Sequence, residues 1–398
     1  MSPERNEPVG FVPPVYPFDR LGEFHELAAR HEGGPVDLSI GTPCDPPPTA
    51  VLEALAGSGS ERGYPASVGS AELRESAAAW IGRRFSVAVE PAAVAACVGT
   101  KELVAGVPHW LRLRTPSKDT VLHPALAYPT YEMGAVLAGC RAVAVPVRPD
   151  GSLELSAVSD DDAARAVVLW VNSPANPAGT LDDLAAAAAW GRRHGVPVFS
   201  DECYAEFTWD GPPRSILQNG LDGVVAVHSL SKRSNLAGLR VGFFAGDAAI
   251  VEYLAALRRH AGFMVPGPVQ HAAAVALADD RHVEAQRARY LERLGLMSEA
   301  LTCCGLESPM PGGAFYLWAS AGDAGADVAG SVADESAGFA LGRALAREGG
   351  VVVSPGEAYG PAGRPFVRLA VVQPLERLRL VAGRLAGKDL RPVAAAST

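Results

Sequence analysis

The sequence has 398 residues, of which 48% are hydrophobic and 20% are charged. This composition provides ample material for a buried core, in one large domain or two interleaved domains, and excludes disorder as the main state. With 35 basic against 44 acidic residues, the net charge of −9 argues against a nucleic-acid partner and against binding to an anionic membrane face. Chemistry on a small molecule is therefore favoured.

The cysteines and the N-terminal sequence indicate the compartment. None of the six cysteines forms a CxxC pair, and the adjacent Cys303 and Cys304 lack the separation of an ordinary disulfide. The N-terminal segment has prolines and charges where a signal peptide has its apolar core, and no stretch is long enough to span a membrane. We expect a cytoplasmic protein with no membrane partner, and we predict no metal site.

From about residue 100 to 250, short runs rich in Val, Ile and Phe alternate with Ala- and Leu-rich helical stretches. This alternation is typical of parallel strands joined by crossover helices, so it predicts a doubly wound α/β domain. Helix 181–194 should carry Asp182 and Asp183 in its first turn and Gly195 after its end. We place strands near 119–124, 166–172, 196–200, 223–230 and 240–246, and the other helices at 101–112 and 131–139.

The pattern changes after Pro268 to one that predicts a smaller α+β domain. It contains helices near 280–301, 335–347 and 374–385, with the strand-like segments GGAFYLWAS, VVVSPG and FVRLAVV between them. Segment 321–336 is rich in Gly, Ala and Asp, and we expect an exposed loop there. We assign 45–270 to the large domain, and 1–44 with 271–398 to the small domain.

Polar residues follow the predicted strands of the large domain. Because ligands bind beyond the carboxyl ends of the strands in open α/β sheets, these residues should meet at one site. Taken singly, Lys232 could be a surface charge and the others ordinary turn or cap residues. Together they fit a ligand with a ring nitrogen, a phenolic oxygen, a phosphate and an aldehyde. The residues are Asn176 in VNSPANPAG, Asp201 and Tyr204 in SDECY, Ser229, Ser231 and Lys232 in HSLSK, and Thr100 and Lys101 in VGTKEL.

In this order the set resembles the fold-type I pyridoxal-phosphate enzymes of the aspartate aminotransferase class, from Gly41 to Arg368. The resemblance implies pyridoxal 5'-phosphate as cofactor and a homodimer with shared active sites. Lys232 would form the internal aldimine and serve as general base, while Asp201 would keep the pyridine nitrogen protonated.

The resemblance also implies a role for each remaining residue. Asn176 and Tyr204 would hydrogen-bond the phenolic oxygen, and Tyr128 would stack on the ring in preference to Tyr131. Arg368 would bind the substrate α-carboxylate, in a pocket lined by Gly41 and Asn176. The phosphate would be held by the amides of Thr100 and Lys101, by Ser229, Ser231 and Arg240, and by Tyr64 of the partner chain.

Within the class, HSLSKRSNLAG, SDECY and AYPTY resemble the N-succinyldiaminopimelate aminotransferases. We expect amino transfer between an amino acid, with glutamate as donor, and a keto acid such as that of N-succinyl-diaminopimelate. The pair Glu61-Arg62 departs from that group; Arg62 could read a distal carboxylate from the partner chain or be a surface charge paired with Glu61.

Two other functions stay open. A pyridoxal-phosphate cyclase, or a carbon-carbon bond-forming enzyme or lyase of secondary metabolism, would keep the same cofactor residues. A non-enzymatic regulatory domain is disfavoured, because Lys232, Asp201 and Arg368 are all present and no helix-turn-helix precedes the domain.

Overall fold

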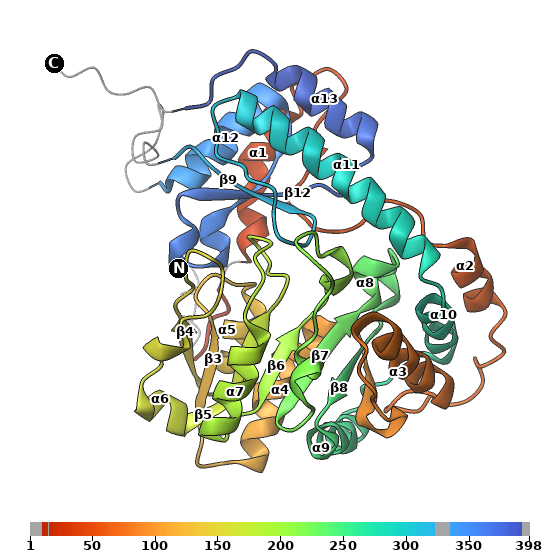
Figure 1. Cartoon of the computed structure of the whole chain (residues 1–398). Coiled ribbons are helices and arrows are strands. Elements are labelled where there is room, and N and C mark those ends of the chain that lie inside the picture. The colour runs from red at the N-terminus through yellow and green to blue at the C-terminus, as the bar shows by residue number, and fades with distance from the viewer. Residues whose placement is uncertain (1–9, 15, 323–334, 392–398) are drawn as a thin grey trace, which may run out of the picture.

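The computed structural model describes residues 10–14, 16–322 and 335–391, which form a larger and a smaller part (Figure 1). The larger part is built on a seven-stranded sheet with the order β2-β8-β7-β6-β5-β3-β4. Every neighbouring pair is parallel except the two that involve β8. The mostly parallel α/β architecture predicted from the sequence is confirmed. The strands are β2 (Val94–Cys97), β3 (Thr120–Pro124), β4 (Arg141–Val145), β5 (Ala166–Asn172), β6 (Val198–Asp201), β7 (Val224–Ser229) and β8 (Gly242–Gly246).

Helices cover both faces of this sheet, so its central strands are buried on both sides. Consecutive residues enter opposite cores: Leu169 packs in one core and Trp170 in the other, as do Phe243 and Phe244. This is why the strands read as continuous apolar runs. The helices are α2 (Thr49–Ala56), α3 (Ala71–Phe85), α4 (Thr100–Arg114), α5 (Thr130–Leu137), α6 (Asp160–Arg165), α7 (Leu184–His194), α8 (Leu230–Arg233), α9 (Ala248–His260) and α10 (Gly267–Ala278).

The structure corrects several predicted elements. Strands β2 and β4, at the two edges of the sheet, were not predicted. Helix α7 begins at Leu184 because Asp183 is its N-cap and accepts the Ala186 amide; Asp182 instead accepts the Leu153 amide. Strand β8 begins at Gly242 because Arg240 has φ of +52°, a left-handed conformation that a strand cannot contain.

The smaller part combines both ends of the chain. Strand β1 (Val36–Asp37) pairs in parallel with β10 (Val351–Val352), and α1 (Gly22–Ala28) packs on α12 (Ala337–Gly349). A second sheet has the antiparallel order β11-β12-β9. The domain limits 45–270 against 1–44 and 271–398 stay a prediction, and most of the predicted 321–336 loop lies outside the described residues. The other elements are α11 (Arg281–Cys303), β9 (Tyr316–Ser320), β11 (Ser354–Pro355), β12 (Phe366–Ala370) and α13 (Leu375–Leu385).

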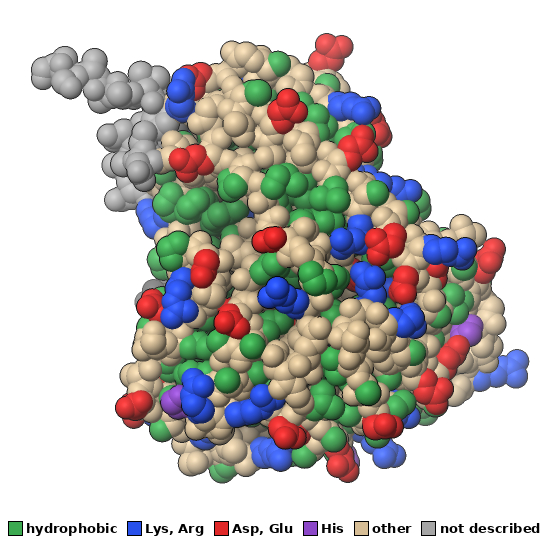
Figure 2. All heavy atoms as spheres, viewed as in Figure 1, with side chains coloured by type: hydrophobic (Ala, Val, Ile, Leu, Met, Phe, Trp, Pro, Cys, Tyr) green, Lys and Arg blue, Asp and Glu red, His purple; other side chains and the backbone are tan. Residues whose placement is uncertain are grey.

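Short 3-10 helices connect many of these elements, at Pro17–Leu21, Pro91–Ala93, Leu155–Ala157, Ala205–Phe207, Ile216–Asn219, Ala237–Leu239, Gly356–Tyr359 and Pro361–Gly363. No helix within the described ranges is long and apolar enough to cross a membrane. On the face drawn in Figure 2, Lys and Arg side chains are interspersed with Asp and Glu, and hydrophobic side chains gather where the two parts meet. This face therefore shows no large patch of one charge sign of the kind that binds nucleic acid.

Candidate active site

A cavity of about 400 Å³ lies at the carboxyl ends of β5, β6 and β7, which end at Asn172, Asp201 and Ser229. Tyr64 is 99% exposed and does not line it. All the other predicted site residues do, so residues spread over more than 300 positions meet at one place. They are Gly41, Thr100, Lys101, Tyr128, Asn176, Asp201, Tyr204, Ser229, Ser231, Lys232, Arg240 and Arg368.

Lys232 lies in α8, directly after β7. Ser229 caps this short helix by accepting the Ser231 amide at 3.1 Å, and the Lys232 ammonium donates to the Gly41 carbonyl at 2.5 Å. Burial lowers the pKa of Lys232 to about 8. A substantial fraction of this lysine is therefore a neutral amine, the nucleophilic form, at mildly alkaline pH. A side chain at Gly41 would collide with the Tyr316 hydroxyl, so glycine is what allows the backbone at position 41 to lie so close to Tyr316.

Asp201 is oriented by two donors. Its Oδ2 accepts from the Tyr131 hydroxyl at 2.9 Å, and its Oδ1 accepts from the Cys203 amide at 3.2 Å. Burial raises the pKa of Asp201, and these two hydrogen bonds oppose that rise. The contact with Tyr131 was missed from the sequence, which contained only the ambiguous motif AYPTY; the half-buried Tyr128 lines the cavity from the same motif.

Arg368, in β12 of the smaller part, is buried and lines the cavity. Its Nη1 donates to Asn176 Oδ1 at 2.8 Å, and its Nη2 donates to the Ser39 carbonyl. The guanidinium lies 4.4 Å from the Tyr316 ring centre and 5.0 Å from that of Tyr359. Its buried Nε has no hydrogen-bond partner among the described residues. A planar cation with an unused donor is suited to a carboxylate ligand.

Tyr316 is a second residue that the sequence reasoning missed. Its hydroxyl lies 2.7 Å from that of Tyr204, and both rings are buried. The segment GGAFYLWAS predicted a strand but contained no signal for a site residue. Through this contact and the Arg368 stack, the smaller part contributes directly to the cavity wall.

Several groups that can bind an anion also line the cavity. Gly99 has φ of +74° and precedes α4, and a side chain there would collide with the Arg240 guanidinium. The free amides at the start of this 15-residue helix therefore lie beside a cation. Cys203 Sγ, also missed, donates to Thr100 Oγ1 at 3.3 Å. The Ser229 and Ser231 side chains complete a set of donors suited to a phosphate.

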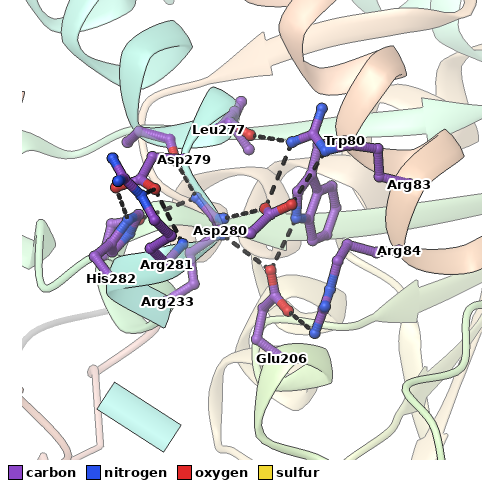
Figure 3. A network of polar contacts seen from close by, with 12 residues as sticks. Trp80, Arg83, Arg84, Glu206, Arg233, Leu277, Asp279, Asp280, Arg281 and His282 are labelled. Atoms are coloured by element: carbon purple, nitrogen blue, oxygen red, sulfur yellow. Dashed lines mark hydrogen bonds and ion pairs between the residues drawn. The ribbon is translucent and has the colours of Figure 1, made fainter. Parts of the chain in front are cut away.

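A polar network contains Glu206 and Arg233, both of which are buried (Figure 3). Arg233 directly follows Lys232, and Glu206 follows Tyr204 by two positions. The Glu206 carboxylate accepts from Arg233 Nε at 3.2 Å, which joins the segment that carries Tyr204 to the helix that carries Lys232. The other partners of the Glu206 carboxylate are Trp80 Nε1 at 2.8 Å and Arg84 Nη2 at 2.7 Å.

Residues 34–385 match the model of the family Aminotransferase class I and II. The chain therefore belongs to this family, and it is an aminotransferase of the fold-type I class. The resemblance drawn from the motifs is confirmed. The family also favours amino transfer over the cyclase, lyase and regulatory alternatives that the sequence left open.

Three relatives illustrate the similarity. The chain is 42% identical to a probable aminotransferase of Mycobacterium tuberculosis, over 94% of this chain and 85% of that protein. It is 41% identical to the 4-dedimethylamino-4-oxo-anhydrotetracycline transaminase OxyQ of Streptomyces rimosus, over 94% and 99%. The structure of a probable N-succinyldiaminopimelate aminotransferase of Thermus thermophilus superposes with a TM-score of 0.79 and 32% identity, over 92% and 98%.

Proposed function

We propose that this aminotransferase holds pyridoxal 5'-phosphate in the cavity described above, with Lys232 as the lysine that binds its aldehyde. The amino group would move from an amino acid, glutamate among them, to a keto acid. The observation that carries the proposal is the meeting of Lys232, Asp201 and Arg368 in one cavity that also holds an anion site.

The residues present fit this cofactor. Its phosphate suits the donors of the anion site, and its ring nitrogen, when protonated, suits the Asp201 carboxylate. Burial raises the pKa of Asp201, and a protonated ring nitrogen beside it would oppose this rise and favour the ionised carboxylate. When bound, the cofactor supplies an aldehyde that takes up the amine and a ring that delocalises electrons from the substrate carbon.

The chain's own groups then have distinct tasks. Arg368 binds the α-carboxylate, and the Lys232 amine takes the α-proton, which its lowered pKa permits at mildly alkaline pH. Asn176 Oδ1 is occupied by Arg368, so its amide NH₂ is the group that can donate to the phenolic oxygen. Tyr204 is the other donor to that oxygen.

For the substrate, two candidates have support. The motif resemblance and the similarity to the Thermus thermophilus protein favour the keto acid of N-succinyl-diaminopimelate as acceptor. The similarity to OxyQ, named as a transaminase of a 4-oxo-anhydrotetracycline, supports amination of a ketone of secondary metabolism as the second candidate.

We further propose a homodimer in which Tyr64 reaches the partner's phosphate site. Its exposure of 99% in the single chain suits a residue that contacts another chain. Arg62 is exposed nearby, and Glu61 accepts a hydrogen bond from Ser58 at 3.0 Å. Arg62 therefore stays a candidate to bind the distal carboxylate of a substrate held in the partner chain's site.

The decisive experiment treats the purified holoenzyme with glutamate. Amino transfer predicts release of 2-oxoglutarate with conversion of the cofactor to pyridoxamine phosphate. Borohydride reduction followed by peptide mapping should place the label on Lys232, and Lys232→Ala should lose both the label and turnover. A label on Lys101 instead would contradict the assignment.

A further inference from the structure

Glu102 fixes the loop that leads into α4, the helix whose first amides belong to the anion site. Gly99 is the N-cap of this helix and Glu102 is its third residue, the position from which an acidic side chain can reach back to a backbone amide. Glu102 Oε1 accepts the amide of Val98, directly before Gly99, at 2.8 Å. The position of the loop, and of the free amides that follow it, therefore depends on the Glu102 side chain.

Glu102 is in turn held by Arg258 of α9. Arg258 Nη1 donates to Glu102 Oε2 at 2.8 Å, and its Nη2 donates to Glu102 Oε1 at 2.6 Å. The Arg258 side chain is 1% exposed. Its guanidinium lies over three aromatic rings, with the ring centres of Phe263 at 5.1 Å, Trp110 at 5.3 Å and Phe244 at 5.9 Å. Rings that exclude water around a cation leave the carboxylate as its main source of stabilisation, so the pair is firmly held.

The charge of Glu102 would disfavour a phosphate at the start of α4 if it were not balanced. A carboxylate in the first turn repels a dianion bound at the same helix end, and the Glu102 side chain is only 19% exposed, so water screens this repulsion weakly. The bidentate pair with Arg258 cancels the charge and still leaves Oε1 on the Val98 amide. Neither Glu102 nor Arg258 lines the cavity, so both would act on a ligand only through the loop and the field around it.

We propose that Arg258 is a positioning residue for the phosphate group of pyridoxal phosphate. It acts through Glu102, by fixing the loop that enters α4 and by cancelling the carboxylate charge beside the phosphate. This inference rests on the proposed function, because the ligand is the phosphate of the cofactor proposed there. The two arginines then have different tasks: Arg240 lines the cavity and can contact the phosphate, whereas Arg258 holds the loop on which the phosphate rests.

The test compares two ligands of the full-length apoenzyme by equilibrium dialysis: pyridoxal phosphate, and pyridoxal, which lacks the phosphate. Arg258→Met keeps an unbranched stem among the aromatic rings and removes the charge and the fork. It should weaken binding of pyridoxal phosphate about tenfold or more, the scale of a lost hydrogen bond to a charged group, and leave pyridoxal within about twofold of wild type. General damage to the fold would weaken both ligands alike, so the ratio of the two dissociation constants reports on the phosphate alone.

Two more variants keep the test independent of how well Arg258→Met folds. The double variant Glu102→Gln/Arg258→Met leaves no unpaired buried charge; its glutamine can still accept the Val98 amide, and no carboxylate remains to repel the phosphate, so most of the ratio should return to the wild-type value. Arg258→Lys keeps the cation but cannot hold both carboxylate oxygens in a planar fork, so it should change the ratio in the same direction as Arg258→Met by a smaller factor.

Arg293→Met is the matched control, because Arg293 also forms a buried bidentate pair, with Asp45, and neither of these residues lines the cavity. This variant should leave the ratio unchanged. A ratio in Arg258→Met and Arg258→Lys equal to that of wild type, a double variant that recovers nothing, or an equal change in Arg293→Met would overturn the role of Arg258. Failure of the proposed function would show separately, as wild-type apoenzyme that binds pyridoxal phosphate no more tightly than pyridoxal, or as holoenzyme that transfers no amino group from glutamate.

Discussion

The bidentate ion pair between Asp45 and Arg293 offers a sharp test of how the two parts of the chain are held together. Arg293 Nη1 and Nη2 donate to the two carboxylate oxygens at 2.6 and 2.7 Å, and Gln286 donates to the same carboxylate at 2.8 Å. The arginine side chain is 5% exposed and the aspartate 12%. The pair joins the segment before α2 to the long helix α11.

Asp45→Asn keeps the size of the side chain and removes its charge, which leaves a buried guanidinium without its ionic partner. Breaking a buried pair in this way costs about 3 to 5 kcal/mol, and the partial exposure of Asp45 favours the lower end. At about 2.1 cal/mol/K of unfolding entropy per residue, 398 residues correspond to about 0.8 kcal/mol/K. The expected decrease in Tm is therefore about 4 °C.

The assay is thermal unfolding at saturating cofactor, with Asp119→Asn as the matched control. Asp119 also forms a bidentate pair, with Arg165 at 2.9 and 2.6 Å, but both side chains are more than a third exposed. Water replaces the lost contact there, so the change in Tm should fall within the error of the measurement. Equal changes in the two variants would refute the reasoning from burial.

The pH dependence of the same pair has a definite sign. Burial alone would raise the pKa of Asp45, but the bonds from Arg293 and Gln286 outweigh it and hold the pKa below its ordinary value. The stabilisation is therefore complete above the unfolded pKa of about 4 and is lost as the pH falls below it. The difference in Tm between wild type and Asp45→Asn should shrink at acid pH.

Three further predictions concern the site. The rate at which apoenzyme takes up pyridoxal phosphate should rise with pH to a midpoint near 8, the lowered pKa of Lys232, and a midpoint near 10 in stopped-flow absorbance would contradict the buried amine. Arg368→Lys should raise KM about tenfold or more for every amino acid in steady-state assays, because all share the α-carboxylate; an effect confined to acidic substrates would reassign it. Mixing the inactive variants Tyr64→Ala and Lys232→Ala should restore part of the activity through hybrid dimers with one intact site, and a fully active monomer by light scattering would exclude this arrangement.

The elements that the sequence predicted well are those with strong local signals. The buried run of β5 was placed at its observed limits, and Gly195 ends α7 in the left-handed conformation expected of a glycine after a helix. The two strands of the seven-stranded sheet that were missed lie at its edges. Strand β2 has only four residues, three of them alanine or cysteine, and β4 begins with an exposed arginine. Neither has the β-branched apolar run that identifies a central strand.

The sequence by itself predicted the fold class and most of the residues that line the cavity around Lys232. This was possible because parallel strands bring their carboxyl ends to one edge, so residues at strand ends are neighbours in space whatever lies between them. Only the tertiary structure decided that Tyr131 donates to Asp201 and that Tyr316 lies against the Arg368 guanidinium. Those contacts join residues that are tens of positions apart, and they depend on how side chains pack between elements, for which no local sequence pattern exists.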